Sequence, residues 1–170
     1  AGCFVHERHG NNTALPRFGG WWGNDPATRF EMRTHRQFEP RSGADGWQLS
    51  NPPILAMAPL LASLELFQAA GIDALRAKSL QLTGALEAMI DALPARPFHV
   101  ITPRDASQRG AQLSLRIDGD AAEFQRRLQA RGVIADRRDP DVIRLAPAPL
   151  YNSFHDIWRL AGILAEVGAK

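Results

Sequence analysis

The spacing of apolar residues changes character at Ile54 and again at Pro94. Residues 1–53 are rich in Gly, Pro, Arg and aromatic residues and show little helical periodicity, which predicts a short strand at residues 3–5 followed by long loops. Loops of that length are more often functional than structural filler. From Ile54 the apolar residues recur every three or four positions, which predicts one helix that stops at Gly71 and a longer one that stops before Pro94.

Beyond Pro94 the period alternates between that of strands and that of helices. Asp120 and Ser153 stand where helices need N-caps, and Gly132 stands where a helix would stop. The predicted strands are 98–102, 111–117, 133–136 and 142–146, with a turn at 137–141, and the predicted helices are 120–132 and 153–168. The order β-β-α-β-β-α predicts an α+β sandwich with helices on one face of a small sheet.

The composition limits the classes of protein to which this chain can belong. With 170 residues, 45% of them hydrophobic, the chain can bury a real core as one domain or two small ones. A formal net charge of only +2 argues weakly against a dedicated nucleic-acid binder. Cys3 is the only cysteine, which leaves no disulfide framework and favours a reducing compartment, with the cytoplasm as the default.

The sequence pattern predicts neither a signal peptide nor a membrane span within these residues. No stretch approaches the roughly 20 apolar residues that a span requires, and the start lacks a basic segment leading into a long apolar one. Because the chain enters at once on a strand-like run without an initiator Met, we expect it to be a fragment.

Arg144 is the first candidate binding residue. On a strand at 142–146, Val142, Arg144 and Ala146 share one face, while Ile143 and Leu145 point to the other. A guanidinium held on a rigid strand offers a planar fork that can grip a carboxylate with two parallel hydrogen bonds. The alternative is an edge-strand arginine paired with a nearby aspartate.

Two loop motifs are further candidates. In "GGWWGND", residues 19–25, Trp21 and Trp22 lie between glycines that let backbone approach a ligand closely, and a buried indole N–H needs an acceptor. The alternative is a pair of aromatics that plug a domain or subunit interface. In "SNPPI", residues 50–54, two prolines would hold the Asn51 amide at the entrance to the first helix, although a plain turn is the alternative.

Other polar motifs favour structural roles. "HERH", residues 6–9, lacks the spacing of the helical zinc motif, whose two histidines are four positions apart, so no metal is expected there. The chain has no glycine-rich loop of the P-loop or dinucleotide type. The remaining histidines are interpreted as surface or capping residues: His35, His99 and His155.

Taken in order, several motifs resemble the carboxy-terminal part of kynureninases. The members of this family are pyridoxal-phosphate enzymes of the aspartate-aminotransferase fold type. The motifs are "GWWGND", "SNPPI", "SLELF", "LRAKSLQLTG", "RGAQLSL" and above all "IRLAPAPLYNSFHDIWRL". The resemblance implies an α/β fold in which residues 1–53 end the large cofactor-binding domain, 54–93 are linking helices and 94–170 form a small α+β domain. It also implies hydrolysis of L-kynurenine, or its 3-hydroxy form, to an anthranilate and L-alanine in tryptophan catabolism, by a homodimer with active sites at subunit and domain interfaces.

The resemblance also implies residue roles. Arg144 would bind the substrate's α-carboxylate, and Trp21 would contact the cofactor phosphate. Trp22 stands where the family usually has phenylalanine beside the cofactor or substrate ring. Asn51 would lie near the phosphate and the substrate aryl group, serving the neighbouring subunit's site. Asn24 stands where histidine is common, which leaves its role open.

One departure from the family concerns catalysis. The family's Schiff-base lysine lies in a Tyr-Lys motif that would precede residue 1, and neither Lys78 on the long helix nor the terminal Lys170 is a credible substitute. We therefore expect no catalytic residue in this chain, no activity without the missing N-terminal half, and no metal. Two alternatives stay open: another enzyme of the same fold type, such as a cysteine desulfurase-like lyase, and a non-catalytic α+β ligand-binding or dimerisation module.

Overall fold

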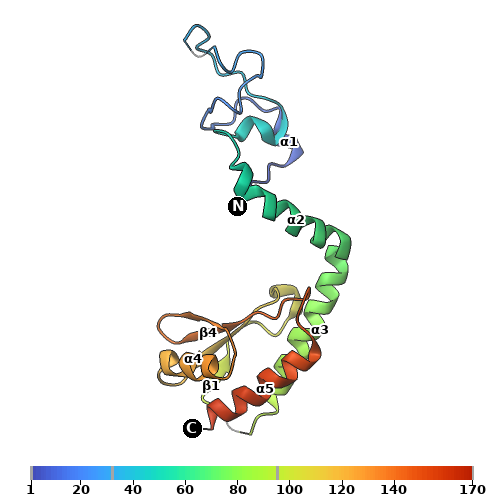
Figure 1. Ribbon diagram of the computed structural model, residues 1–170, viewed down its shortest axis with the longest axis vertical. Coiled ribbons are helices and arrows are strands. Elements are labelled where there is room, and N and C mark those ends of the chain that lie inside the picture. Colours follow the sequence, from blue (N-terminus) through green and yellow to red (C-terminus); the bar gives the residue numbers. More distant parts are fainter. Residues whose placement is uncertain (1, 32, 95, 170) are drawn as a thin grey trace. The chain divides into compact units, whose positions relative to one another are not determined.

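The computed structural model describes residues 2–31, 33–94 and 96–169. The chain divides into two compact units, Ala1–Ser63 and Leu64–Lys170 (Figure 1). The boundary falls inside helix α2 (Ile54–Ala70).

The first unit consists mainly of loops. Apart from the start of α2, it holds the short helix α1 (Glu7–Gly10) and the 3-10 helix η1 (Gly43–Trp47). The strand predicted at residues 3–5 is wrong: this segment is not a strand, and within the described part of the unit the sole β pairing is the isolated bridge between Asn24 and Pro40. A strand needs a hydrogen-bonding neighbour, which this segment lacks here.

Helices α2 and α3 (Ile72–Asp91) confirm the two helices predicted from the apolar spacing. They are separated by Gly71, whose φ of 78° lies in the left-handed region that glycine adopts at no steric cost. Across the described residues, no single helix is both long and apolar enough to cross a membrane; only α2 and α3 taken together reach that length and composition, over the bend between them.

The second unit is built on an antiparallel sheet of four strands in the order β1-β2-β4-β3. Its strands and helices follow the predicted order β-β-α-β-β-α. They are β1 (Phe98–Val100), β2 (Leu113–Ile117), α4 (Ala121–Ala130), β3 (Asp136–Arg138), β4 (Val142–Leu145) and α5 (Phe154–Gly168), with the 3-10 helix η2 (Ala106–Gln108) before β2. The predicted N-caps are confirmed, because Asp120 accepts from two backbone N–H groups of α4 and Ser153 forms a capping box with Asp156.

The strand predicted at 133–136 is displaced toward the C-terminus. Val133 instead closes α4, since its N–H donates to the carbonyl of Leu128 at 3.0 Å, and Ile134 is 96% exposed. Pairing with β4 begins at Asp136, opposite Arg144, and continues to Arg138, opposite Val142. Two of the residues predicted as turn are therefore strand, because the ladder is set by the partner strand rather than by local apolar content.

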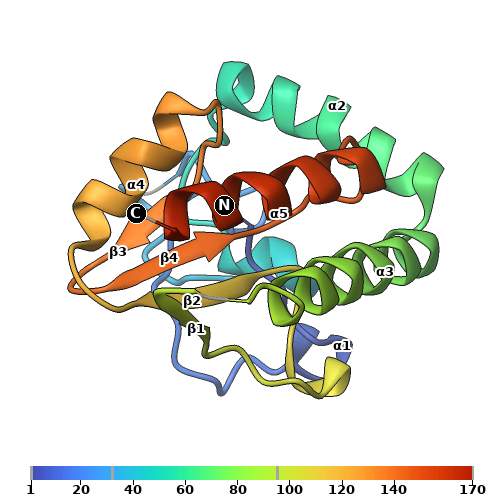
Figure 2. The same ribbon diagram turned by 90° about the horizontal axis from the view of Figure 1, so that it is seen from below.

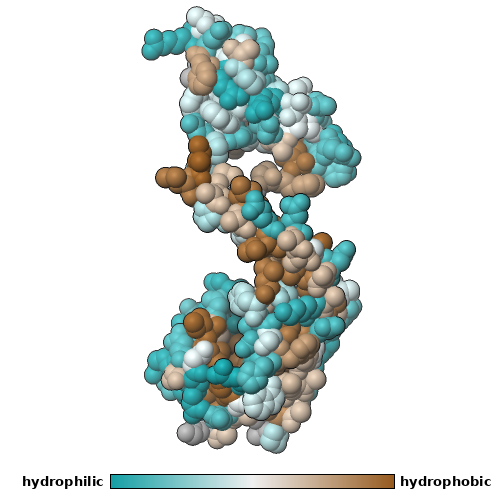
Figure 3. Space-filling view, turned by 45° about the vertical axis from the view of Figure 1, so that its right-hand side comes forward, coloured by the Kyte–Doolittle hydropathy of each residue, from teal (hydrophilic) through white to brown (hydrophobic). Residues whose placement is uncertain are grey.

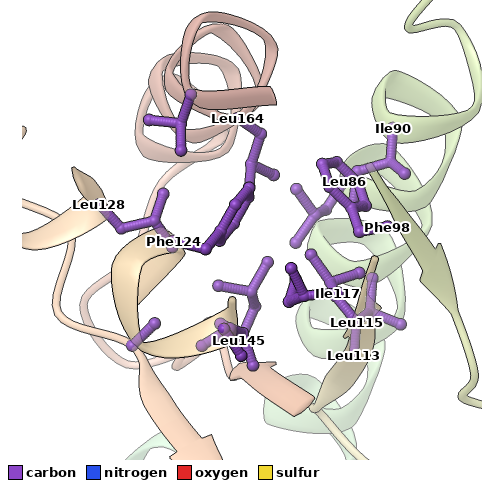
Figure 4. Packing of buried hydrophobic residues seen from close by; sticks show 14 of the residues in the cluster. Leu86, Ile90, Phe98, Leu113, Leu115, Ile117, Phe124, Leu128, Leu145 and Leu164 are labelled. Carbon is purple, nitrogen blue, oxygen red and sulfur yellow. The ribbon is translucent and has the colours of Figure 1, made fainter. Parts of the chain in front are cut away.

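One face of the sheet forms the core with the helices. Figure 2 shows α4 and α5 side by side across the sheet, with α3 beside α5. Leucine, isoleucine and phenylalanine side chains interdigitate between the layers (Figure 4). The strands contribute Phe98, Leu113, Leu115, Ile117, Ile143 and Leu145, and the helices Leu82, Leu86, Ile90, Phe124, Leu128, Ile157 and Leu164. The opposite sheet face carries the polar residues of the same strands, because successive strand residues alternate between faces.

Candidate functional site

Arg144 lies in the middle of the polar face of the sheet. Its register partners are Ser114 on β2 and Asp136 on β3, so all three side chains lie on the face opposite the core. Ile143 and Leu145 are buried on the other face, which confirms the alternation predicted for this strand. The expectation of an edge strand is wrong, since β4 lies between β2 and β3 and is held by hydrogen bonds on both sides.

The Arg144 guanidinium is paired with Asp136, as one of the two interpretations of this residue predicted. Its Nε donates to Asp136 Oδ2 at 2.6 Å, and its Nη2 donates to the same oxygen. Arg138 Nε lies 3.1 Å from that oxygen as well. The hydrogen bond from Arg144, reinforced by the charges of both arginines, lowers the pKa of Asp136 below its ordinary value.

The loop that follows β4 is held in place by side chains of unit 2. Lys78 Nζ on α3 donates to the carbonyl of Pro149 at 2.7 Å, and Asn152 Oδ1 accepts from the N–H of Ala148 at 2.7 Å. The capping box of α5 begins immediately afterwards, at Ser153. The ammonium of Lys78 therefore has a structural partner, and the motif "APAPLYNS" is a fixed connection between the arginine's strand and α5.

In unit 1 the two loop motifs lie against each other. Trp21 Nε1 donates to Ser50 Oγ at 3.2 Å, which joins the first motif to the residue before Asn51. Gly20 permits this contact, because a Cβ there would lie 2.1 Å from the carbonyl oxygen of Leu49. The close approach of the two backbones is the physical reason for glycine at this position.

Trp22 lies in a cluster of aromatic and cationic groups. Its ring packs edge-on against Trp21, with ring centroids 5.8 Å apart, and Trp21 packs in the same way against Phe30 at 5.5 Å. The guanidinium carbon of Arg29 lies 4.6 Å from the centroid of the Trp22 ring, and Arg29 is 7% exposed. This cation–π contact holds the indole in place.

The two asparagines behave differently. Asn24 is buried, and its Oδ1 accepts from the N–H of Glu39 at 2.8 Å, beside the bridge to Pro40. Its side chain therefore ties two loops together. Asn51 is exposed, and within the described residues its amide makes no hydrogen bond, so this polar group is free for a ligand or another chain.

The histidines have local partners. His6 Nδ1 accepts from the N–H of Arg8 at the start of α1, His99 pairs with Asp118 at 3.1 Å, and His155 stacks on Trp158. In the described part of the chain, no group of three or more His, Cys, Asp or Glu residues could hold a metal ion.

Three residues of these sites had little or no signal in the sequence. Asp136 was expected only as an unspecified nearby aspartate, and the strand register identifies it. Ser50 precedes the quoted asparagine by one position, and its contact with Trp21 spans 29 residues. Arg29 contacts Trp22 from a position seven residues further along a loop, where periodicity predicts no contact.

The chain is similar in sequence to one protein family and to curated members of it. A family model described as the kynureninase C-terminal domain matches residues 75–164. A kynureninase of Salinispora tropica is 54% identical over 168 residues, which cover 97% of this chain and 39% of that protein. A kynureninase of Myxococcus xanthus is 56% identical over 163 residues, which cover 96% of this chain and 38% of that protein. The chain thus spans less than two fifths of the length of these curated relatives.

Solved structures show the same fold at low identity. The chain resembles an apo cysteine desulfurase from Thermococcus onnurineus NA1 with a TM-score of 0.72 and 14% identity, over 97% of this chain and 42% of that one. It resembles the cystine C-S lyase C-DES, solved with its product cysteine persulfide, with a TM-score of 0.64 and 23% identity, over 90% of this chain and 39% of that one. These likenesses show that the chain has the fold of the corresponding part of these enzymes, in agreement with the aspartate-aminotransferase fold type expected from the sequence.

Proposed function

Because this chain belongs to the kynureninase family, we propose that it is the carboxy-terminal part of a pyridoxal-phosphate hydrolase that cleaves L-kynurenine, or its 3-hydroxy form, to an anthranilate and L-alanine. The observation that carries this proposal is Arg144, a half-exposed cation on a rigid inner strand. The reaction is supported by the relatives, which are both named kynureninase and align with nearly the whole chain.

Arg144 binds the substrate's α-carboxylate in this proposal. Arginine suits the task because its planar donors match the two oxygens of a carboxylate. The polar sheet face holds Arg144 and Arg138 against the single carboxylate of Asp136, so the three groups together keep a net positive charge for an anion.

The phosphate of the cofactor is held by unit 1 in this proposal. In this structure the single indole N–H of Trp21 donates to Ser50 Oγ; in the proposal it turns to a phosphate oxygen instead, and the Ser50 hydroxyl and the amide of the next residue, Asn51, add neutral donors. The Trp22 ring, fixed by Arg29, supplies a flat apolar surface for an aromatic ring. When bound, pyridoxal phosphate supplies an electron sink for the charge left after the substrate loses its α-proton.

The lysine that carries the cofactor comes from another part of the enzyme. Lys78 donates to Pro149, and Lys170 lies outside the described residues. We therefore propose that the chain alone is inactive, that it works joined to an N-terminal half in a homodimer, and that Asn51 serves the partner subunit. The cytoplasm is the proposed compartment.

The test uses the full-length protein that contains this chain. Purified protein is given pyridoxal phosphate and then L-kynurenine or 3-hydroxy-L-kynurenine, and the anthranilate products are followed by their fluorescence. Arg144→Met should lower kcat/KM by at least about a hundredfold, because a charge-assisted carboxylate contact is lost. The matched control Arg126→Met removes an exposed arginine of α4 and should change little.

Three results would contradict the proposal. If the full-length protein formed no anthranilate from either substrate, the reaction would be wrong. If Arg144→Met behaved like Arg126→Met, the carboxylate would be bound elsewhere. Product formed by residues 1–170 alone would overturn the expectation that the chain lacks its catalytic lysine.

A further inference from the structure

Asp136 engages one particular edge of the Arg144 guanidinium. Nε and Nη2 of Arg144 both donate to Asp136 Oδ2, so these two nitrogens mark the side-on edge of the planar group. Within the described residues, no group accepts a hydrogen bond from Nη1 of Arg144. The end-on edge, formed by Nη1 and the outer hydrogen of Nη2, is therefore open.

We propose that Asp136 is a positioning residue for the carboxylate site: it holds the side-on edge of Arg144 so that the end-on edge is presented to the substrate's α-carboxylate. This inference rests on the carboxylate-binding role proposed above for Arg144. It adds a residue that does not itself touch the substrate and that acts only through the guanidinium.

The sheet makes this arrangement rigid. Asp136 and Arg144 are directly opposite each other on neighbouring antiparallel strands, where Cβ atoms lie about 5 Å apart. β4 is hydrogen-bonded on both sides, and the residues that flank Arg144 along the strand, Ile143 and Leu145, are packed in the core. The backbone under the pair is thus fixed, and the long arginine side chain is the part that needs orientation.

The charges around the pair let Asp136 orient Arg144 without competing with the substrate carboxylate. Arg138 Nε lies 3.1 Å from the same Asp136 oxygen, so the aspartate is already shared by two cations. Its pKa lies below the ordinary value because of these partners, and it stays ionised throughout the neutral range. A substrate carboxylate can therefore bind the open edge of Arg144 without displacing Asp136.

The arrangement is tested in the full-length enzyme with Asp136→Asn, which keeps the shape and removes the charge. Asp139→Asn is the matched control, because Asp139 is an acid of the same hairpin with an 81% exposed side chain that pairs with Arg137 instead. Asp136→Ser is the second variant if Asp136→Asn does not give folded protein, since a small hydroxyl suits an exposed strand position. Circular dichroism melts establish folding in each case.

The expected result is a rise in KM for L-kynurenine of about tenfold in Asp136→Asn, with kcat within about threefold of the parent, since one charge-assisted orienting contact is lost. Inhibition by the carboxamide of L-kynurenine, which lacks the carboxylate, should not change. In an Arg144→Lys background, Asp136→Asn should have no further effect, because the two residues act as one unit.

The outcomes separate this inference from the proposed function. If Arg144→Lys raises KM while Asp136→Asn matches Asp139→Asn or lowers KM, the positioning role is overturned and the proposed function stands. A loss of affinity for the carboxamide equal to that for kynurenine would mean a general structural defect and would also overturn it. If Arg144→Lys leaves KM unchanged, the carboxylate site itself is wrong, and the inference falls with it.

Discussion

The two units of this chain differ in how they treat their apolar residues. In unit 2 the buried leucines, isoleucines and phenylalanines of three helices and a sheet form one core. Among the described residues of unit 1, none of the large apolar side chains is buried, and the apolar helix α2 has no buried residue along its length. Figure 3 shows hydrophobic side chains gathered on the surface over α2.

Unit 2 is stabilised by apolar side chains that it buries within itself, and unit 1 is not. Burial of apolar area is the dominant favourable term in folding. Unit 2 gains it internally, whereas the loops of unit 1 are held by single hydrogen bonds and aromatic contacts such as those of Trp21 and Trp22. Unit 1 and α2 expose many large apolar side chains, and a gathering of such side chains on a surface is typical of an interface with another protein segment.

The largest expected effect is on folding of the separate pieces. A fragment of residues 71–170 should unfold in one cooperative transition, since it contains the whole core, while a fragment of residues 1–63 should show none. Chemical denaturation followed by circular dichroism measures this. A cooperative transition in the 1–63 fragment would contradict the contrast between the units.

A pair of leucine substitutions compares the same change in the two environments. Leu86→Ala removes a side chain with 0% exposure from α3 and should lower the free energy of unfolding by roughly 3 kcal/mol, because it leaves a cavity. Leu55→Ala, at a side chain that is 91% exposed on α2, should change it little. Urea denaturation of each variant of the chain gives both values, and equal effects would break the comparison.

A smaller effect is expected from a charge pair on the edge of the unit 2 core. Glu87 Oε2 lies 3.0 Å from Arg109 Nη2, and the Arg109 side chain is 6% exposed. Glu87→Ala should destabilise unit 2 by about 2 kcal/mol, because a nearly buried cation loses its partner. Glu123→Ala removes the exposed partner of Arg126 and is the control, expected to cost less than about 1 kcal/mol. Similar losses in thermal melts would contradict the burial argument.

The smallest effect is a pH dependence at the end of α3. Hydrogen bonds from Arg104, with further help from Arg96, lower the pKa of Asp91 from 3.8 to about 2. A depressed carboxyl pKa stabilises the folded state above pH 3.8, and this contribution is lost as the pH falls from 3.8 through about 2. The stability difference between the parent and Asp91→Asn should therefore shrink over that range in denaturation at several pH values. A difference independent of pH would contradict it.

The sequence predicted the elements of unit 2 far better than those of unit 1. Periodicity and caps located α3, α4 and α5, because Asp120, Gly132 and Ser153 act on their own neighbours in the chain. The strand at residues 3–5 was wrong, since a strand depends on a partner. The start of β3 was displaced by three residues and its end by two for the same reason: its register is decided by β4.

Sequence alone determined the family, the order of elements in unit 2 and the side of the sheet on which Arg144 lies, because these depend on local spacing and on motifs. Tertiary structure alone decided that β4 is an inner strand, that Asp136 is the partner of Arg144, and that Trp21 lies against Ser50. Each of these contacts joins residues brought together by folding, and neither periodicity nor composition specifies which distant residue will be the partner.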